Sequence, residues 1–371
     1  MNSFASTEDQ VMLADNLNRF LSDSNEFGRR RSRLSGANPD RTALWPAFAE
    51  QGVIAAAFDE SRGGFAGDAR TVAVVMAEIG AALAIEPYLA TAVIAGRILN
   101  RWTDRTASQK AIDAIIAGEL ICVLAHNAHL DPSAEPPLRI TSPSGTIGLT
   151  GTIRAVRHGD VAQSFLVPVQ ADADSVQFYF LDRNHPGVTI DQFRLIDSAG
   201  AADLHFDMAA VPESARMPLA HPGREALDEA LDWGILGVAA EAAGIISALN
   251  STTFSYLNTR KQFGSVLAGF QALQHRAADM WIAAEELLAV VELAIEAMSG
   301  GRAEHRAAIM AATKIVADGA GRKVGNESVQ LHGGMGVSDE LIVSHYFRRL
   351  AAIRGEWGSE DSHRLRVRSV R

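Results

Sequence analysis

Three long helical patterns in the last two-fifths of the chain constrain its fold more than any other feature. Apolar residues recur at helical spacing through Leu227–Tyr256, Phe270–Met298 and Ala303–Leu331, and only short connections separate these segments. Helices of this length can cross a whole domain, and short connections place successive helices antiparallel. The sequence therefore predicts a C-terminal helical bundle over residues 223–371.

Two regions with different spacing of apolar residues precede this bundle. Residues 1–118 are predicted to form an N-terminal helical domain, because apolar spacing of three and four residues runs through Val11–Phe20, Trp45–Gln51, Arg70–Leu83 and Tyr88–Trp102. Residues 119–222 are predicted to form a β domain, a small sandwich or barrel. Its expected strands are Leu120–Leu124, Gly148–Thr152, Ser164–Val169, Ser175–Phe180, Val188–Gln192 and Asp203–Phe206. The predicted fold class is α+β.

Composition narrows the classes of function. The 371 residues carry a net charge of −10, which disfavours a nucleic-acid partner, although a local basic site for an anionic ligand remains compatible with it. One cysteine and eleven scattered histidines offer neither a disulfide framework nor a metal-binding motif. The polar N-terminus and the lack of an uncharged apolar run of spanning length favour a cytoplasmic protein without a membrane span.

The first motif that carries chemistry is RKQFG at Arg260–Gly264, after the first long helix of the bundle. A guanidinium can bind a pyrophosphate through two hydrogen bonds, and Phe263 can pack on an aromatic ring. By itself the motif is also explained by a helix C-terminus with a favourable cation and a glycine cap.

The second motif is QLHGGMG at Gln330–Gly336, after the last long helix. One glycine there is explained by a helix C-cap. Three glycines within four positions let another molecule approach the backbone, and the Gln330 amide offers hydrogen-bonding groups beside them.

Together, the two motifs and the order helical–β–helical resemble the acyl-CoA dehydrogenase family. Gly52–Leu83, with its DESRGGFAG loop, is similar to the family's N-terminal segment, and the likeness extends over nearly the whole chain. The resemblance implies an N-terminal α-helical domain, a middle β-barrel or sandwich and a C-terminal four-helix bundle. It also implies FAD as cofactor, α,β-dehydrogenation of an acyl-CoA thioester, and an electron-transfer flavoprotein as the next electron acceptor.

In that family both motifs face the FAD of a neighbouring subunit, which requires an oligomer. The arginine contacts the pyrophosphate, and the glutamines and glycines lie against the nucleotide. Carried onto this chain by resemblance, the cofactor-binding residues are Arg260, Gln262, Phe263, Gln271, Gln330, Gly333 and Gly334.

The family's catalytic base is a glutamate that removes the α-proton. At its commonest position, counted without gaps, this chain has Trp357, with Glu356 one residue away; at the alternative position it has Gly234. Glu241, seven residues further along an apolar helix, is therefore the candidate catalytic residue, and Asp232 is a weaker one. An interhelical ion pair would explain Glu241 equally well.

The family's flavin-ring wall is also altered in this chain. The segment Leu124–Asp131 lacks hydroxyl groups at the expected places, and Ala155–Arg157 aligns with a Trp-x-Thr pair. This combination resembles the bacterial branch that forms heteromeric α2β2 complexes, in which FAD sites combine two homologous subunits. The hypothesis is thus a dehydrogenase subunit of a hetero-tetramer.

Three alternatives remain open at this stage. They are a homo-tetramer that uses Glu241, a non-catalytic subunit that completes a partner's FAD site, and a flavin monooxygenase or nitroalkane-oxidase type of enzyme on the same fold. The acyl group is not readable from the sequence. The small residues Ala239–Gly244 around Glu241 leave room for a bulky acyl chain, or else serve close helix packing.

Overall fold

A computed structural model describes residues 3–36, 38–127, 136–141, 147–172, 175–300 and 302–369. Contacts between residues group the chain into two compact units. The first, here called the helical unit, comprises Met1–Ser32, Ala69–Ala84 and Ile235–Arg371. The second, the sheet unit, comprises Arg33–Asp68 and Ile85–Gly234. The three domains expected from the sequence follow the order of the elements instead, so their boundaries stay a prediction.

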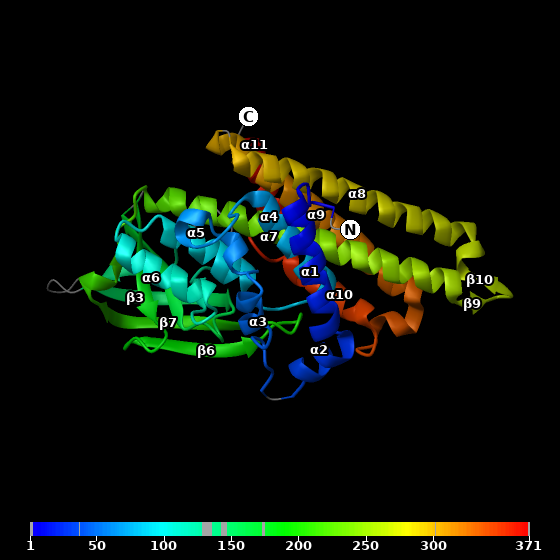
Figure 1. Cartoon of the computed structure of the whole chain (residues 1–371), viewed down its shortest axis with the longest axis horizontal. Coiled ribbons are helices and arrows are strands. Elements are labelled where there is room, and N and C mark those ends of the chain that lie inside the picture. Colours follow the sequence, from blue (N-terminus) through cyan, green and yellow to red (C-terminus); the bar gives the residue numbers. More distant parts are fainter. Residues whose placement is uncertain are drawn as a thin grey trace. The chain divides into compact units, whose positions relative to one another are not determined.

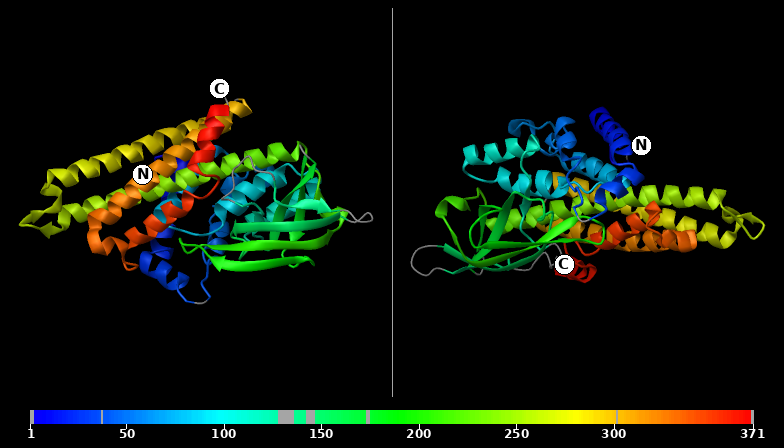
Figure 2. Two further views of the ribbon diagram at one scale, coloured as in Figure 1. Left: turned by 180° about the vertical axis from the view of Figure 1, so that it is seen from behind. Right: turned by 90° about the horizontal axis from the view of Figure 1, so that it is seen from below.

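The helical unit is built around three long helices. The helix α7 spans Gly223–Thr259 and enters this unit at Ile235, α8 spans Gln271–Ser299, and α9 spans Ala303–His332. Figure 1 shows them side by side, with a small hairpin joining α7 to α8 at one end, and both views of Figure 2 agree. All three predicted long helices are confirmed, with ends within four residues of those expected.

Shorter helices complete this unit. They are α1 (Glu8–Ser24), α2 (Phe27–Leu34), α4 (Ala69–Ala82), α10 (Ile342–Ile353) and α11 (Glu360–Ser369). The sequence predicted α1 and α4. Thr7 caps α1 through a reciprocal pair of hydrogen bonds with Gln10, which explains why the helix begins there.

The helices α4 and α7 cross at two glycines. A Cβ atom built on Gly80 would lie 2.2 Å from the carbonyl oxygen of Glu241, and one on Gly244 would lie 1.9 Å from that of Ala77. The two backbones therefore meet where only hydrogen atoms fit between them. Close helix packing thus accounts for Gly244, one of the two explanations that the sequence left open for the small residues of α7.

The sheet unit contains a mixed sheet of eight strands in the part of the chain that the structure describes, in the order β6-β7-β3-β2-β4-β5-β8, with β1 paired to β4. The strands are β1 (Cys122–Leu124), β2 (Arg139–Thr141), β3 (Ile147–Arg157), β4 (Ser164–Asp172), β5 (Ser175–Asp182), β6 (Val188–Arg194), β7 (Gly200–Val211) and β8 (Arg216–Met217). All six predicted strands are present. The pairing of β1 with β4 is parallel, whereas β3 and β7 pair antiparallel with two register shifts.

In the sequence, some helices of the sheet unit precede the strands and others follow them. They are α3 (Trp45–Glu50), η1 (Ala55–Ala57), η2 (Glu60–Arg62), η3 (Tyr88–Ala95), α5 (Gly96–Asn100), α6 (Arg105–Ile116), η4 (Glu213–Ala215) and the first turns of α7. The predicted helix over Tyr88–Trp102 is present as a π-helix, η3, followed by α5.

Among the described residues, α7 is the one helix long and apolar enough to cross a membrane by length and composition. However, 83% of its most apolar window is buried inside the protein. Protein packing therefore accounts for its hydrophobicity.

Candidate functional site

The RKQFG motif forms a hairpin rather than a helix end. After α7 stops at Thr259, β9 (Lys261–Gln262) pairs antiparallel with β10 (Ser265–Val266). Phe263 and Gly264 form the two-residue turn, with φ of 51° and 80°. Such turns need positive φ at both positions, which is why a glycine follows the phenylalanine. The reading of Gly264 as a helix cap is therefore wrong.

This hairpin presents its side chains outward. Phe263 is 90% exposed, and its ring lies edge-to-face with that of Phe270, at 6.3 Å between ring centroids. Arg260 is exposed as well, and its guanidinium has no ion pair or hydrogen bond with the described residues. A large aromatic ring left in water is costly, so this arrangement indicates a surface that another molecule covers.

The QLHGGMG motif ends α9 and begins η6 (Gly333–Val337). Gly333 caps the helix with φ of 61° and donates its N–H to the carbonyl of Gln330, which confirms the C-cap explanation for this glycine. A Cβ atom on Gly333 or Gly334 would meet nothing within 4 Å, whereas one on Gly336 would lie 2.4 Å from the carbonyl oxygen of Val329. Gly336 therefore serves packing, and the other two leave backbone open.

The two motifs share one end of the bundle. Tyr256 of α7 stacks on His332 of α9 with 4.3 Å between ring centroids, and Arg276 of α8 contacts Glu327 of α9 at 2.5 Å. Burial lowers the pKa of His332, so this contact holds a neutral imidazole at pH 7. We call this end the bundle tip, defined by Arg260, Gln262, Phe263, Gln271, Gln330, Gly333 and Gly334.

Two residues of the same end were missed at the sequence level. Met335 is 54% exposed and Val337 is 72% exposed, next to the open glycines. The signal was present, because both apolar side chains stand beside glycines beyond the last helical turn.

Glu241 lies in a buried ion pair. It is 5% exposed, and its two oxygens accept hydrogen bonds from Nε and Nη2 of Arg349 in α10, at 2.6 and 2.7 Å. Arg349 also donates to Glu356, from Nη1 to Oε1 at 2.5 Å and from Nη2 to Oε2 at 3.3 Å. The structure therefore places Glu241 in the interhelical ion pair that was its alternative explanation. Its assignment as catalytic base stays a prediction.

The turn between α10 and α11 holds the other expected position of the base. Trp357 has φ of 61°, in the left-handed region, and its carbonyl oxygen accepts a hydrogen bond from Nε2 of the buried His363 at 2.7 Å. Glu356 precedes it and points to Arg349. Asp232 is 1% exposed and belongs to the sheet unit, whereas Glu241 belongs to the helical unit.

A second buried ion pair was missed at the sequence level. Lys314 and Asp318 of α9 are 0% and 2% exposed, and the Lys314 ammonium lies 2.6 Å from the nearer oxygen of Asp318. Burial raises the pKa of Asp318 to about 6 and lowers that of Lys314. Spacing of four residues between opposite charges was the available signal.

The altered flavin wall is described in part. The Ala155 N–H donates to Asp203 at 2.7 Å, and the Arg157 guanidinium pairs with Asp197 at 3.0 Å. Alanine and arginine carry neither a hydroxyl nor an indole, so these two positions cannot supply the groups of a Trp-x-Thr pair. At the end of β1, burial and then the nearby Arg224 lower the pKa of His126 to about 4, so its imidazole is neutral at pH 7. Residues 128–131 of the other segment lie outside the described residues.

The bundle tip fits one part of a dinucleotide cofactor. The exposed Arg260 guanidinium, which has no ion pair with the described residues, suits a pyrophosphate. The open backbone at Gly333 and Gly334 admits close approach, and the Phe263 ring can cover an aromatic group. The fold and this tip together indicate a flavoprotein-type oxidoreductase.

Comparison with known proteins identifies the family. The family model "Acyl-CoA dehydrogenase, C-terminal domain" matches residues 221–370, and "Acyl-CoA dehydrogenase, N-terminal domain" matches residues 7–119. The chain therefore belongs to the acyl-CoA dehydrogenase family, whose members are FAD-dependent oxidoreductases acting on CH–CH bonds. This result confirms the predicted fold class, enzyme class and cofactor.

Three similar proteins illustrate the relationship. Acyl-CoA dehydrogenase FadE27 of Mycobacterium tuberculosis is 28% identical over 323 residues, which cover 85% of this chain and 83% of that protein. A chain of the ChsE4-ChsE5 complex from Mycobacterium tuberculosis superposes with a TM-score of 0.89 at 23% identity, covering 99% of this chain and 98% of that one. A variant of the Tcur3481-Tcur3483 steroid ACAD gives a TM-score of 0.87 at 24% identity, covering 98% of this chain and 97% of that one.

Proposed function

We propose that this chain carries out FAD-dependent α,β-dehydrogenation of an acyl-CoA as one subunit of a hetero-oligomer, and that its bundle tip completes an FAD site in an adjoining subunit. Bound FAD supplies the hydride acceptor for the β-hydrogen. Arg260 would hold the pyrophosphate, Gly333 and Gly334 would admit the nucleotide portion to the backbone, and Phe263 would shield it from water.

The observation that carries this proposal is the state of the bundle tip. The Arg260 guanidinium has no ion pair or hydrogen bond with the described residues, Phe263 stays 90% exposed beside Phe270, and a Cβ on Gly333 or Gly334 would meet nothing within 4 Å. Each is a group that a ligand or a partner normally covers. A tip directed away from its own bundle supports use by a neighbouring chain.

The carboxylates support a division of labour between subunits. A general base must reach the α-proton of the substrate, within about 3 Å of a free lone pair. Both oxygens of Glu241 and of Glu356 accept hydrogen bonds from Arg349 inside the helical unit. Proton abstraction by Glu241 would require this pair to open first, whereas a partner subunit can supply a base without that cost.

The substrate class is proposed from one similar protein, which is named as a steroid ACAD. Another similar protein is a complex of two named components, which supports the hetero-oligomer. We propose that the acyl group is a fatty or steroid side-chain thioester and that an electron-transfer flavoprotein reoxidises the enzyme.

Flavin content per chain is the primary test. We expect the chain purified alone to hold little flavin and to gain about one FAD per shared site when co-expressed with a homologous subunit. A stoichiometric, catalytically active flavoprotein formed by this chain alone would contradict the hetero-oligomer and favour the homo-tetramer.

Two variants separate the roles within the complex. Arg260→Gln should lower flavin retention, because one charge-assisted contact to the pyrophosphate is lost, while Arg302→Gln, at another exposed site outside the tip, should not. Glu241→Gln should leave turnover within about threefold of the unmodified complex if the base lies elsewhere. A loss of about a thousandfold or more would identify Glu241 as the base.

A further inference from the structure

The bundle tip is assembled from two elements that are far apart in the sequence. The hairpin that begins at Arg260 follows α7, whereas the open glycines Gly333 and Gly334 follow α9. A dinucleotide held by both elements binds tightly only if their spacing is already fixed, because ordering them during binding costs free energy. The contacts that join the ends of α7 and α9 therefore decide how well the tip is prepared for its cofactor.

Tyr256 and His332 form the ring contact between these two helix ends. Their rings stack with 4.3 Å between centroids and 27° between planes. Tyr256 lies four residues before Arg260, about one helical turn, and its carbonyl oxygen accepts the Arg260 N–H at 2.9 Å. His332 directly precedes Gly333 in the chain. The stack therefore connects a residue one turn from the cation with the neighbour of the open backbone.

The ring of His332 is held in a fixed orientation. The residue is 4% exposed, and its Nδ1 donates a hydrogen bond to the carbonyl oxygen of Ser328 at 2.8 Å, because a carbonyl can only accept. Burial lowers the pKa of His332, so the imidazole that faces Tyr256 is neutral at pH 7. A buried ring fixed in this way gives Tyr256 a definite surface on which to pack.

A second contact at this end of the bundle joins α8 to α9. Nε of Arg276 donates to a carboxylate oxygen of Glu327 at 2.5 Å. The two side chains are 36% and 29% exposed, so water screens the pair and weakens its contribution to rigidity. The stack includes a buried ring and joins the two elements that carry Arg260 and Gly333. It is therefore the stronger constraint of the two on the geometry of the tip.

Resting on the FAD site proposed above, we infer that Tyr256 is a positioning residue whose ring, stacked on His332, holds Arg260 at the correct distance from the open glycines. Tyr256 acts through this spacing and needs no contact with the cofactor. Without its ring, each group of the tip is still present, but the hairpin can move relative to the glycine turn. FAD then has to order the tip as it binds, and its affinity falls.

Retention of FAD tests this inference, measured by equilibrium dialysis in whichever assembly of this chain holds FAD, with the homologous subunit or without it. Tyr256→Leu removes the ring but keeps an apolar side chain, and should weaken FAD retention by about three- to tenfold. Tyr256→Phe keeps the ring and should stay within about twofold of the unmodified assembly. Rescue by phenylalanine would assign the effect to the stacked ring and not to the hydroxyl group.

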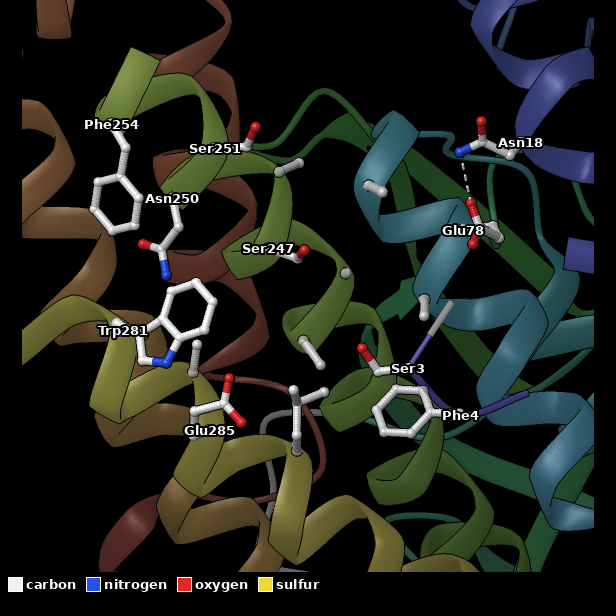
Figure 3. Close-up of a pocket in the computed structure, with 17 residues that line it drawn as sticks. Ser3, Phe4, Asn18, Glu78, Ser247, Asn250, Ser251, Phe254, Trp281 and Glu285 are labelled. Carbon is white, nitrogen blue, oxygen red and sulfur yellow. Dashed lines mark hydrogen bonds between the residues drawn. The ribbon is translucent and has the colours of Figure 1, made fainter. Parts of the chain in front are cut away.

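Phe254→Leu is the matched control, because it removes a ring from the same helix. Phe254 is half-buried like Tyr256 and lies two residues before it, so it points to a side of α7 about 200° away. Figure 3 shows Phe254 lining a pocket of about 630 Å³ between α4, α7 and α8. This variant should leave FAD retention within about twofold of the unmodified assembly.

A double variant separates positioning from an independent role. If Tyr256 acts by placing Arg260, its loss should matter little once the guanidinium is gone. Tyr256→Leu combined with Arg260→Gln should therefore retain FAD within about twofold of Arg260→Gln alone. Losses that add in the double variant would show that Tyr256 acts independently of Arg260 and would overturn the inference.

Two further results would also overturn it. Unchanged FAD retention in Tyr256→Leu would show that the stack does not set the geometry of the tip. An equal loss in Phe254→Leu would assign the effect to a general loosening of α7.

The same measurements separate this inference from the proposed function. If Arg260→Gln lowers FAD retention while Tyr256→Leu does not, the shared FAD site stands and only the positioning role is wrong. If Arg260→Gln leaves FAD retention unchanged, the assignment of the tip is wrong, and the positioning role falls with it.

Discussion

Arg349 and Glu241 face each other across α10 and α7, with both oxygens of the carboxylate accepting hydrogen bonds from the guanidinium at 2.6 and 2.7 Å. Glu356 accepts from the same guanidinium, so one buried cation serves two buried carboxylates. Removal of a single partner from such a pair leaves an uncompensated charge in the interior, which costs far more than the pair contributes.

Arg349→Met should therefore lower the free energy of unfolding by about 3–5 kcal/mol, measured by urea denaturation. Glu241→Gln should cost only about 1–2 kcal/mol, because Arg349 keeps Glu356 and an amide oxygen still accepts one hydrogen bond. Glu296→Gln, at an exposed position of α8, serves as the control and should change stability by less than about 0.5 kcal/mol. Equal effects of Arg349→Met and the control would contradict a buried network.

The Lys314–Asp318 pair predicts a pH dependence. Burial raises the pKa of Asp318 to about 6, above the value near 3.9 of an unfolded aspartate, so the folded state holds more protons between these values. The contribution of Asp318 to the free energy of unfolding is therefore fully present below about pH 4. It is lost as the pH rises through 6, which lowers the stability by about 1–3 kcal/mol. The lowered pKa of Lys314 acts in the opposite direction, towards lower stability as pH falls.

The double variant Lys314→Met with Asp318→Leu removes both groups and should flatten this part of the stability profile. Well-packed apolar residues in place of a buried pair are neutral or stabilising by about 1–4 kcal/mol, so the variant should fold. Urea denaturation at pH 4.5, 5.5 and 6.5 measures the slope. An unchanged slope in the double variant would assign the pH dependence to other groups.

The long helices were predictable because their information is local. Apolar spacing sets α7, α8 and α9, and turn residues separate the strands of the sheet, so each element is decided by neighbours in the sequence. The contact between Gly80 and Glu241 was not predictable, because it joins residues far apart in the chain and depends on how α4 crosses α7.

The candidate site likewise has one part that could be predicted from the sequence and one part that could not. The family resemblance identified the residues of the bundle tip. It did not predict the hairpin at Phe263 and Gly264, because the same residues also fit a helix end and the pairing of β9 with β10 could not be read from them. Glu241 drew attention as a carboxylate in an apolar run. Its partner Arg349 lies 108 residues away, and a single sequence holds no signal for such a distant contact.

The close crossing of α4 and α7 at Gly80 and Gly244 predicts that one added methyl group there lowers the stability of the chain. Gly244→Ala places a Cβ atom against the carbonyl oxygen of Ala77, so α4 and α7 must separate. We expect a loss of about 1–3 kcal/mol in the free energy of unfolding. Gly319→Ala in α9 is the matched control, because a Cβ there meets nothing within 4 Å and helix propensity should raise stability by up to about 1 kcal/mol. A neutral Gly244→Ala would contradict the close crossing.

The two open glycines of the bundle tip predict different effects of the same substitution. Gly333 has φ of 61° and ψ of −141°, a conformation reserved for glycine, so Gly333→Ala should destabilise the chain by about 1–3 kcal/mol. Gly334 has no such strain and free space around it, so Gly334→Ala should change the melting behaviour little.

Flavin binding should reverse this order of sensitivity. In the complex with the partner subunit, the added methyl group of Gly334→Ala occupies the surface offered to the nucleotide, and we expect about tenfold weaker FAD retention, or about 1.4 kcal/mol. Equilibrium dialysis measures the retention of FAD by the complex, and thermal unfolding measures the stability of the chain without flavin. If Gly334→Ala lowers the melting temperature as much as Gly333→Ala while FAD retention is unchanged, these glycines serve the fold and not the cofactor.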